Sequence, residues 1–164
     1  MYLLDANVLI DANDNYYPLD RVPEFWDWLL HHGRANEVKI CVEMYEEITG
    51  DGPLPTWLAQ DDVRSALLLP DDSDQAVVSQ VVDQGYAADL TDIEVQAIGR
   101  DPFIVAHAMA DIQNRIVVTT EHSAPSKRRQ NRKIPDVCNQ FGVRWCDPFA
   151  FYRRLNFRTG WRPQ

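Results

Sequence analysis

Short apolar runs alternate with amphipathic stretches along the chain, and this alternation predicts strands that are followed by helices. Strands are predicted at residues 2–4, 38–42, 116–119 and 143–145, where short apolar runs occur. Residues 63–69 fit either a strand or the end of a helix, because so short an apolar run does not decide between the two.

Helical patterns follow these strands, and several of them begin at a proline. They are predicted from residue 7, from residue 23 to a stop at Gly33, from residue 43 to Gly50, around residues 57–58, over residues 74–84 and 101–114, and from Pro135 and Pro148. The start at Asp101 and Pro102 is the clearest, with Asp101 expected as the N-cap.

Strands that alternate with helices are typical of an α/β protein whose parallel sheet is covered on both faces. A length of 164 residues suits one domain. The sequence contains neither an internal repeat nor a linker long enough to divide it. We therefore expect one α/β domain.

The composition indicates a soluble protein of a reducing compartment. Hydrophobic residues make up 45% and charged residues 25% of the chain, which excludes disordered, collagen-like and coiled-coil classes. No apolar run approaches the ~20 residues that span a bilayer. Asp5 and Asp11 interrupt the first apolar stretch, so neither a secretory signal nor membrane association is expected. Three cysteines without a CxxC pair argue against a disulfide framework, and we expect a cytoplasmic protein.

Charge is unevenly distributed along the chain, although the net charge of -9 argues against a nucleic-acid partner when taken alone. Residues 115–164 hold eleven Lys and Arg against three Asp and Glu, whereas residues 1–114 hold five against twenty-two. Such asymmetry most often reflects a solvated surface. The acidic residues must therefore be judged by their positions.

Several acids lie where predicted strands end, which is the edge of a parallel sheet at which ligands bind. Asp5 ends the first strand, Glu121 follows the third, and Asp101 opens the helix before that strand. On the helix after the second strand, Glu47 is a candidate that could point back over the sheet, and Glu43 and Glu46 are equally plausible inward acids. Each acid also has a structural explanation, such as helix capping by Asp5 or pairing of Glu121 with a nearby base.

Four such carboxylates would require compensation if they gathered at one edge of the sheet. At a separation of ~5 Å, each pair would repel by about 3 kcal/mol at an effective dielectric constant of 20. Either some of the acids hold protons at neutral pH or a divalent cation lies among them. Oxygen ligands alone favour Mg²⁺ or Mn²⁺ over zinc.

Four blocks of the sequence resemble, in order, those of the PIN-domain ribonuclease family. LLDANVLID resembles the opening strand and helix, in which an Asp is followed two positions later by Ser, Thr or Asn, and so matches Asp5 and Asn7. ICVEMYEEI resembles the second block, whose closing Glu matches Glu47. DPFIVAHAMA resembles the third and matches Asp101, and VVTTEHS resembles the fourth, with Glu121 in place of the more usual Asp.

The resemblance covers residues 1–155. The segment KIPDVCNQFGVRWCDPFAFYR, together with Trp57 after the GDGPLP turn, also resembles a bacterial branch of PIN-like proteins, which is similar to the toxins of toxin–antitoxin pairs. The family resemblance implies a three-layer α/β/α domain with a central parallel sheet at residues 1–155, followed by a basic C-terminal tail at residues 156–164. It also implies a ribonuclease that uses Mg²⁺ or Mn²⁺ to cut phosphodiester bonds. RNA, a cognate antitoxin protein and a second copy of the chain are the partners that this resemblance implies.

From this resemblance we expect specific roles for the matched residues. Asp5 and Asp101 are expected as the principal metal ligands, with Glu47 and Glu121 completing the set directly or through water. Asn7 and Thr119 are then expected to orient the ligands or the attacking water.

A basic loop directly follows the fourth acid. Its cations could bind the phosphate backbone of RNA beside the metal site. Without the neighbouring acids, a flexible, solvated loop would be the preferred explanation. These cations are Lys127, Arg128, Arg129, Arg132 and Lys133.

Other classes of protein fit the sequence less well. A phosphotransferase of the haloacid-dehalogenase kind needs a second Asp where Asn7 stands, and a nucleotide-binding protein needs a Gly-rich loop that is missing after the first strand. The serious alternative is a PIN-like domain that no longer cuts RNA and acts as a binding or assembly module.

Overall fold

A four-stranded parallel sheet forms the centre of the computed structural model, which describes residues 1–162. The strands β1 (Tyr2–Leu4), β2 (Val38–Lys39), β3 (Ile116–Val118) and β4 (Arg144–Cys146) lie in the order β2-β1-β3-β4. Leu3 of β1 lies between Lys39 of β2 and Val117 of β3, and Val117 lies beside Trp145 of β4. The parallel pairing confirms the sheet predicted from the alternation of strands and helices.

Helices connect the strands and lie on both sides of the sheet. From β1 to β2 run α1 (Ala6–Asp11), the π-helical segment η1 (Ala12–Tyr16) and α2 (Pro23–Arg34). From β2 to β3 run α3 (Val42–Tyr45), α4 (Pro53–Leu58), α5 (Asp61–Leu67), α6 (Gln75–Gln80), the π-helical segment η2 (Val81–Ala87), α7 (Asp92–Ile98) and α8 (Asp101–Ala110). The 3₁₀ turn η3 (Arg129–Asn131) and α9 (Ile134–Phe141) precede β4, and α10 (Pro148–Arg154) follows it.

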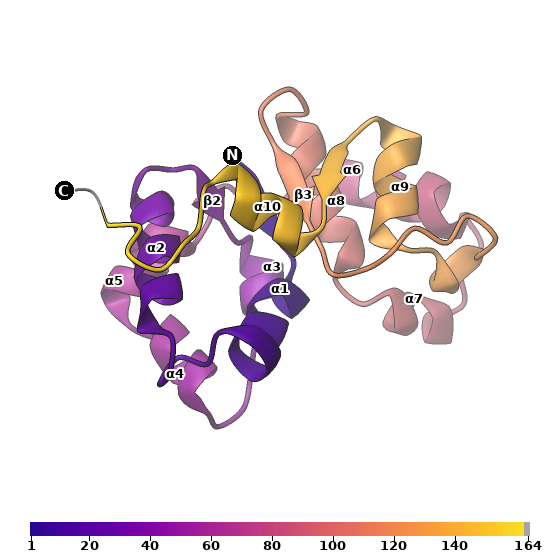
Figure 1. Cartoon of the computed structure of the whole chain (residues 1–164). Helices are drawn as coiled ribbons and strands as arrows, with labels where there is room; N and C mark the ends of the chain where they lie inside the picture. The colour runs from indigo at the N-terminus through magenta and orange to yellow at the C-terminus, as the bar shows by residue number, and fades with distance from the viewer. Residues whose placement is uncertain (163–164) are drawn as a thin grey trace.

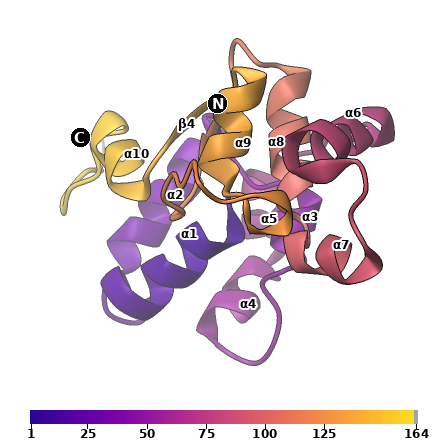
Figure 2. The ribbon, with the colours of Figure 1, turned by 90° about the vertical axis from the view of Figure 1, so that its right-hand side faces the viewer.

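The helices are arranged in layers around the sheet. Figure 1 shows α1 and α2 on one side of the strands and α6, α8 and α9 on the other, and Figure 2 looks onto the second side. This arrangement buries both faces of the strands, so Leu3, Leu4, Val117 and Val118 are at most 1% exposed.

An aromatic core lies along α2. Phe25, Trp26 and Trp28 are at most 2% exposed, and Tyr17 stacks on Phe25 with ring centroids 4.4 Å apart. Phe151 of α10 contacts Trp28 at 5.5 Å between ring centroids. Tilted and edge-to-face aromatic contacts of this kind add to the burial of apolar area, so they hold α10 against α2.

The structure corrects the interpretation of Gly33, which was expected to stop the helix that begins at Pro23. The helix continues through Gly33 to Arg34, and Asn36 supplies the positive φ of 57° that follows the helix end. A Cβ on Gly33 would lie 2.7 Å from Cδ2 of Leu67 and 3.0 Å from the carbonyl oxygen of Ala66. Gly33 therefore permits close packing of α2 on α5.

Other elements differ from their predicted extents. In the undecided segment 63–69, α5 continues to Leu67, and Leu68 then forms a parallel bridge with Ile40. The helix expected from residue 43 to Gly50 is the shorter α3, and α8 ends four residues before the predicted end. The sequence analysis did not predict α7, which begins with a capping box formed by Thr91 and Glu94.

The C-terminal residues pack on α2. The indole nitrogen of Trp161 donates a hydrogen bond of 2.8 Å to the carbonyl oxygen of Glu24, and Arg162 pairs with Asp27. The expected tail therefore lies against the domain up to Arg162, whereas Pro163 and Gln164 lie outside the described residues. Among residues 1–162, no helix has both the length and the apolar character needed to cross a membrane.

Candidate functional site at the carboxyl ends of the strands

The order of the strands reverses between β1 and β3. From β1 the chain passes to β2 on one side, while β3 and β4 lie on the other side. Ligands bind in open parallel sheets where the strand order reverses in this way. The residues that follow β1 and β3, Asp5 and Thr119, therefore lie at the position where a ligand is expected.

Asp5 is held by both strands. Its backbone N–H donates to the carbonyl oxygen of Val118 at 2.9 Å, and its Oδ2 accepts a hydrogen bond of 2.8 Å from the hydroxyl of Thr119. Its Oδ1 accepts from the backbone N–H of Asn7 at 3.4 Å, so Asp5 also caps α1. Burial raises the pKa of Asp5, the bonds from Thr119 and Asn7 oppose that shift, and the charge of Glu121 adds to it.

Asp101 lies at the start of α8, but the prediction that it caps this helix was wrong. Arg100 occupies the N-cap position, and Asp101 is the first helical residue. Burial and the charges of Asp5, Glu121 and Glu47 raise the pKa of Asp101 to about 8, although Lys133 lowers it. The carboxylate of Asp101 therefore lies within electrostatic reach of the three other predicted acids and of Lys133.

Glu121 is fixed by two donors from the following loop and helix. Lys133 Nζ contacts Oε1 at 2.6 Å, and the backbone N–H of Ile134 donates to Oε2 at 2.7 Å. The backbone N–H of Glu121 donates to the hydroxyl of Thr119 at 3.1 Å. Thr119 thus links the third strand to two of the four acids, while Lys133 supplies a positive charge beside them.

Glu47 lies in the turn after α3 and is more exposed than the other acids. Burial and the charge of Asp5 raise its pKa, whereas the charge of Arg100 opposes this shift. The alternatives Glu43 and Glu46 have other partners, because Glu43 contacts His107 and Glu46 pairs with Arg100. Of these three acids, Glu47 is the one that interacts with Asp5 and Asp101.

The four predicted acids thus come from four separate segments and interact electrostatically, but they are not in tight contact. Within residues 1–162, the one group of three or more Cys, His, Asp and Glu residues whose ligand atoms all lie within 4.8 Å of one another is formed by Cys41, Glu43 and His107. No three of the four predicted acids therefore bring ligand atoms within 4.8 Å of one another in the described residues.

The structure adds Tyr86 of η2 to this region, a residue that the sequence analysis did not select. Tyr86 is 6% exposed, and its hydroxyl has no hydrogen-bond partner among the described residues. Burial raises its pKa, and so do the charges of Asp101 and Glu121. A buried phenol usually finds a partner, so this hydroxyl is an available donor near the acids. Only its place in the fold distinguishes it from other tyrosines.

The basic loop is folded, and its cations fall into two groups. Arg129 pairs with Asp89 and Glu94, and Arg132 donates to the carbonyl oxygens of Gly85 and Asp136. Lys127 and Arg128 are exposed, and the ammonium group of Lys127 has no partner in residues 1–162. The loop is also fixed to α9, because Asp136 accepts hydrogen bonds from Ser123 and from the backbone N–H of Ala124.

A hollow lies beside the acids, between α1, η1 and the start of α10. Thr120 and His122, which flank Glu121, line one side, and Tyr16 and Phe149 line another. Tyr16 is 51% and Phe149 43% exposed, and their rings meet edge to face at 5.3 Å between centroids. The exposed aromatic rings of this hollow form a surface on which a flat, apolar group could stack.

The fold and the site define an α/β protein with carboxylates at the point where the order of its parallel strands reverses. A family model described as a domain of unknown function, DUF4411, matches residues 2–159, and the chain belongs to this family. Neither the curated proteins nor the solved structures include a match to the chain.

Proposed function

We propose that this protein is a divalent-metal-dependent ribonuclease with a PIN-like domain. The observation that carries the proposal is the Thr119 hydroxyl at the ends of β1 and β3, which donates to the carboxylate of Asp5 and accepts from the backbone N–H of Glu121. The raised pKa of Asp101, to which burial and the charges of Asp5, Glu121 and Glu47 contribute, supports it. Strongly perturbed carboxylates in a crevice are typical of sites that bind cations or transfer protons. The resemblance of the same four residues to the acids of PIN-domain ribonucleases supports the choice of reaction.

The donor set suits a hard cation. Asp5, Asp101, Glu47 and Glu121 would hold Mg²⁺ or Mn²⁺ through oxygen atoms, directly or through water. The cation would supply Lewis acidity at a phosphodiester and make a water molecule more acidic. Asp101 fits this role because its carboxylate forms no hydrogen bond or ion pair within the described chain, which leaves its oxygens free for a ligand.

Residues around the acids would orient the reactants. Thr119 holds Asp5 in place by its hydrogen bond of 2.8 Å. The backbone N–H of Asn7 donates to Asp5. The side chain of Asn7 is exposed and has no hydrogen-bond partner within the described chain, so it could contact water or substrate. Tyr86 would donate its unpaired hydroxyl to a water molecule or a phosphate oxygen near Asp101 and Glu121.

The neighbouring surfaces offer contacts for a single strand of RNA. The exposed cations Lys127 and Arg128 would contact phosphates, and Tyr16 and Phe149 would stack on bases. Arg129, Arg132 and Lys133 have partners elsewhere in the protein and would contribute mainly by shaping the loop, whereas Arg128 donates to carbonyl oxygens within the loop itself.

Cleavage of mixed RNAs with and without Mn²⁺ tests the proposal. We expect cleavage by the natural chain and its loss in Asp5→Asn, with an unchanged circular dichroism spectrum. The exposed Asp20, which lies in a turn outside the site, gives the matched control Asp20→Asn, which should cleave normally. Equal activity of Asp5→Asn and Asp20→Asn would refute the assignment of the site.

A binding module without nuclease activity is the second candidate function, and one contact favours it. Lys133 places an ammonium group 2.6 Å from Glu121, where it can balance part of the negative charge without a metal ion. In that case Mn²⁺ would leave the melting temperature unchanged and RNA would remain intact. A metal-dependent nuclease would instead be stabilised by Mn²⁺, because a ligand that binds only the folded state raises its stability.

The resemblance to PIN-like toxins supports a narrower proposal, that this nuclease is the toxin of a toxin–antitoxin pair, acts in the cytoplasm and forms a homodimer. Induced expression of the natural chain should then arrest growth, whereas Asp5→Asn should not. Co-expression with the protein encoded by the neighbouring gene should restore growth if that protein is the antitoxin. Light scattering of the purified chain tests the dimer.

A further inference from the structure

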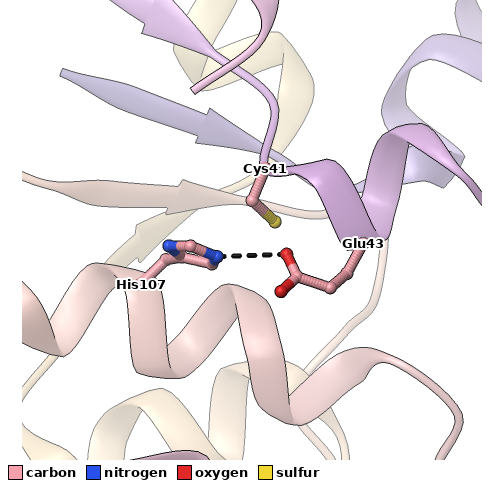
Figure 3. A group of neighbouring side chains, drawn as sticks. All are labelled: Cys41, Glu43 and His107. Atoms are coloured by element: carbon pink, nitrogen blue, oxygen red, sulfur yellow. Dashed lines mark hydrogen bonds and ion pairs between the residues drawn. The ribbon is translucent and has the colours of Figure 1, made fainter. Parts of the chain in front are cut away.

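A second cluster of chemically reactive side chains lies away from the four acids. Cys41 precedes α3, Glu43 lies in the first turn of α3, and His107 lies on α8. Figure 3 shows the three side chains converging between these two helices. One ligand atom from each of them lies within 4.8 Å of the others, and His107 Nε2 lies 3.0 Å from Glu43 Oε2.

The cluster is almost closed to solvent. The side chain of His107 is 1% exposed and that of Glu43 is 13% exposed, while Cys41 is fully buried. Burial raises the pKa of the Cys41 thiol to about 12, and the charge of Glu43 adds to this effect. Burial would raise the pKa of Glu43 too, but its backbone N–H and His107 lower it below the ordinary value. Glu43 therefore carries a buried negative charge beside a thiol and an imidazole.

We propose that Cys41, Glu43 and His107 form a zinc-binding site. The three side chains offer one sulfur, one oxygen and one nitrogen ligand, a mixed set that suits Zn²⁺ and is too soft for Mg²⁺. A water molecule would take the fourth position of the tetrahedron. On binding, the bond between the Cys41 sulfur and its proton breaks, a sulfur–zinc bond forms, and the proton passes to solvent.

The position of the site gives the ion a structural role. Cys41 and Glu43 belong to the segment that leads to Glu47, and His107 lies on the helix that begins with Asp101. Zinc would therefore join the segments that carry two of the four acids. The backbone of α8 is also fixed here, because Arg115 donates to the carbonyl oxygen of His107 at 2.8 Å and pairs with Asp71. This role does not depend on the proposed nuclease activity.

Cobalt and zinc titrations of the purified full chain test the site directly. With Co²⁺ as a spectroscopic probe, we expect a thiolate-to-cobalt charge-transfer band that saturates at about one ion per chain. Addition of Zn²⁺ should remove that band and raise the melting temperature. Cys138 is also fully buried but lies outside the cluster, so Cys138→Ser is the matched control for Cys41→Ser.

The expected result is loss of the band in Cys41→Ser and its retention in Cys138→Ser. His107→Gln should keep the thiol and weaken zinc binding by at least about tenfold, since even loss of a residue that supports a ligand has that effect. Asp101→Asn should leave the band unchanged, so this result is independent of whether the acids bind metal. Absence of a thiolate band in the natural chain would overturn the proposal, and so would equal zinc affinity in the natural chain and His107→Gln. The cluster would then be a hydrogen-bonded His–Glu pair beside a buried thiol.

Discussion

The hydroxyl of Thr119 donates a hydrogen bond of 2.8 Å to Oδ2 of Asp5, although the two residues lie 114 positions apart along the chain. Both residues are buried, with Thr119 fully enclosed and Asp5 2% exposed. The same hydroxyl accepts a hydrogen bond from the backbone N–H of Glu121. One side chain at the end of β3 therefore positions an acid on each of two neighbouring strand ends.

Replacement of Thr119 by Val should destabilise the fold and reduce RNA cleavage. The variant keeps the shape of the side chain but leaves the buried carboxylate of Asp5 without its hydroxyl donor. Loss of a hydrogen bond to a charged group costs about 1.5–3 kcal/mol of unfolding free energy. Urea denaturation measures this change, and Thr119→Ser, which keeps the donor, is the control. Equal stability of the Val and Ser variants would show that the bond contributes nothing.

The strands and the three acids next to them could be predicted because they depend on local patterns. The four predicted strands match the observed ones within a few residues. Asp5, Asp101 and Glu121 could be selected as candidates because they lie next to the predicted ends of strands or the start of a helix. The preference for Glu47 over Glu43 and Glu46 did not come from local pattern. It required a family resemblance, because the direction of each side chain depends on the short α3 and the packing around it.

Other features depend on contacts between distant segments, which no local pattern encodes. Gly33 had the sequence context of a helix stop, yet its role is set by Ala66 and Leu67 on another helix. The buried hydroxyl of Tyr86 is noteworthy only because η2 lies near Asp101. The sequence left the basic loop as either an RNA contact or a flexible, solvated segment, and it could not show that ion pairs of Arg129 with distant acids hold part of the loop in place.

Gly33→Ala should destabilise the protein even though alanine is the better helix former. The added Cβ would overlap Leu67 and press on the carbonyl oxygen of Ala66. Overpacking of this kind costs about 1–3 kcal/mol, which exceeds the gain of ~1 kcal/mol from helix propensity. Urea denaturation should show the loss, whereas Arg34→Ala, at the exposed next position, should change stability by under about 0.5 kcal/mol. A more stable Gly33→Ala protein would contradict the packing role.

In the absence of metal, Asp101 should make the protein less stable as the pH rises. Its pKa is raised from 3.8 to about 8, so between these values the folded state holds a proton that the unfolded chain has released. Uptake of a proton on folding favours the folded state at low pH. That contribution is complete below 3.8 and is lost as the pH rises through about 8.

Asp101→Asn should flatten this dependence, because an amide does not titrate. Urea unfolding in EDTA from about pH 5 to about pH 8 measures the slope of the free energy of unfolding against pH. Some slope should remain in the variant, since the pKa values of Asp5 and Glu47 are also raised. Asp20→Asn, in an exposed turn, should keep the full slope of the natural chain. Parallel slopes for Asp101→Asn and the natural chain would refute the burial of a protonated Asp101.

Two substitutions in the basic loop, Lys127→Ala and Arg129→Ala, should distinguish direct contact with RNA from stabilisation of the loop. Lys127 is exposed and without a partner for its ammonium group in the described residues, whereas Arg129 bridges Asp89 and Glu94. We expect Lys127→Ala to weaken RNA binding with an unchanged melting temperature. The slope of log K for RNA binding against the logarithm of the salt concentration should become shallower by about one. Arg129→Ala should lower the melting temperature because it breaks both ion pairs. Fluorescence anisotropy in EDTA over a series of salt concentrations measures the binding. If Lys127→Ala binds RNA with the natural salt dependence, the loop does not contact the phosphate backbone through this residue.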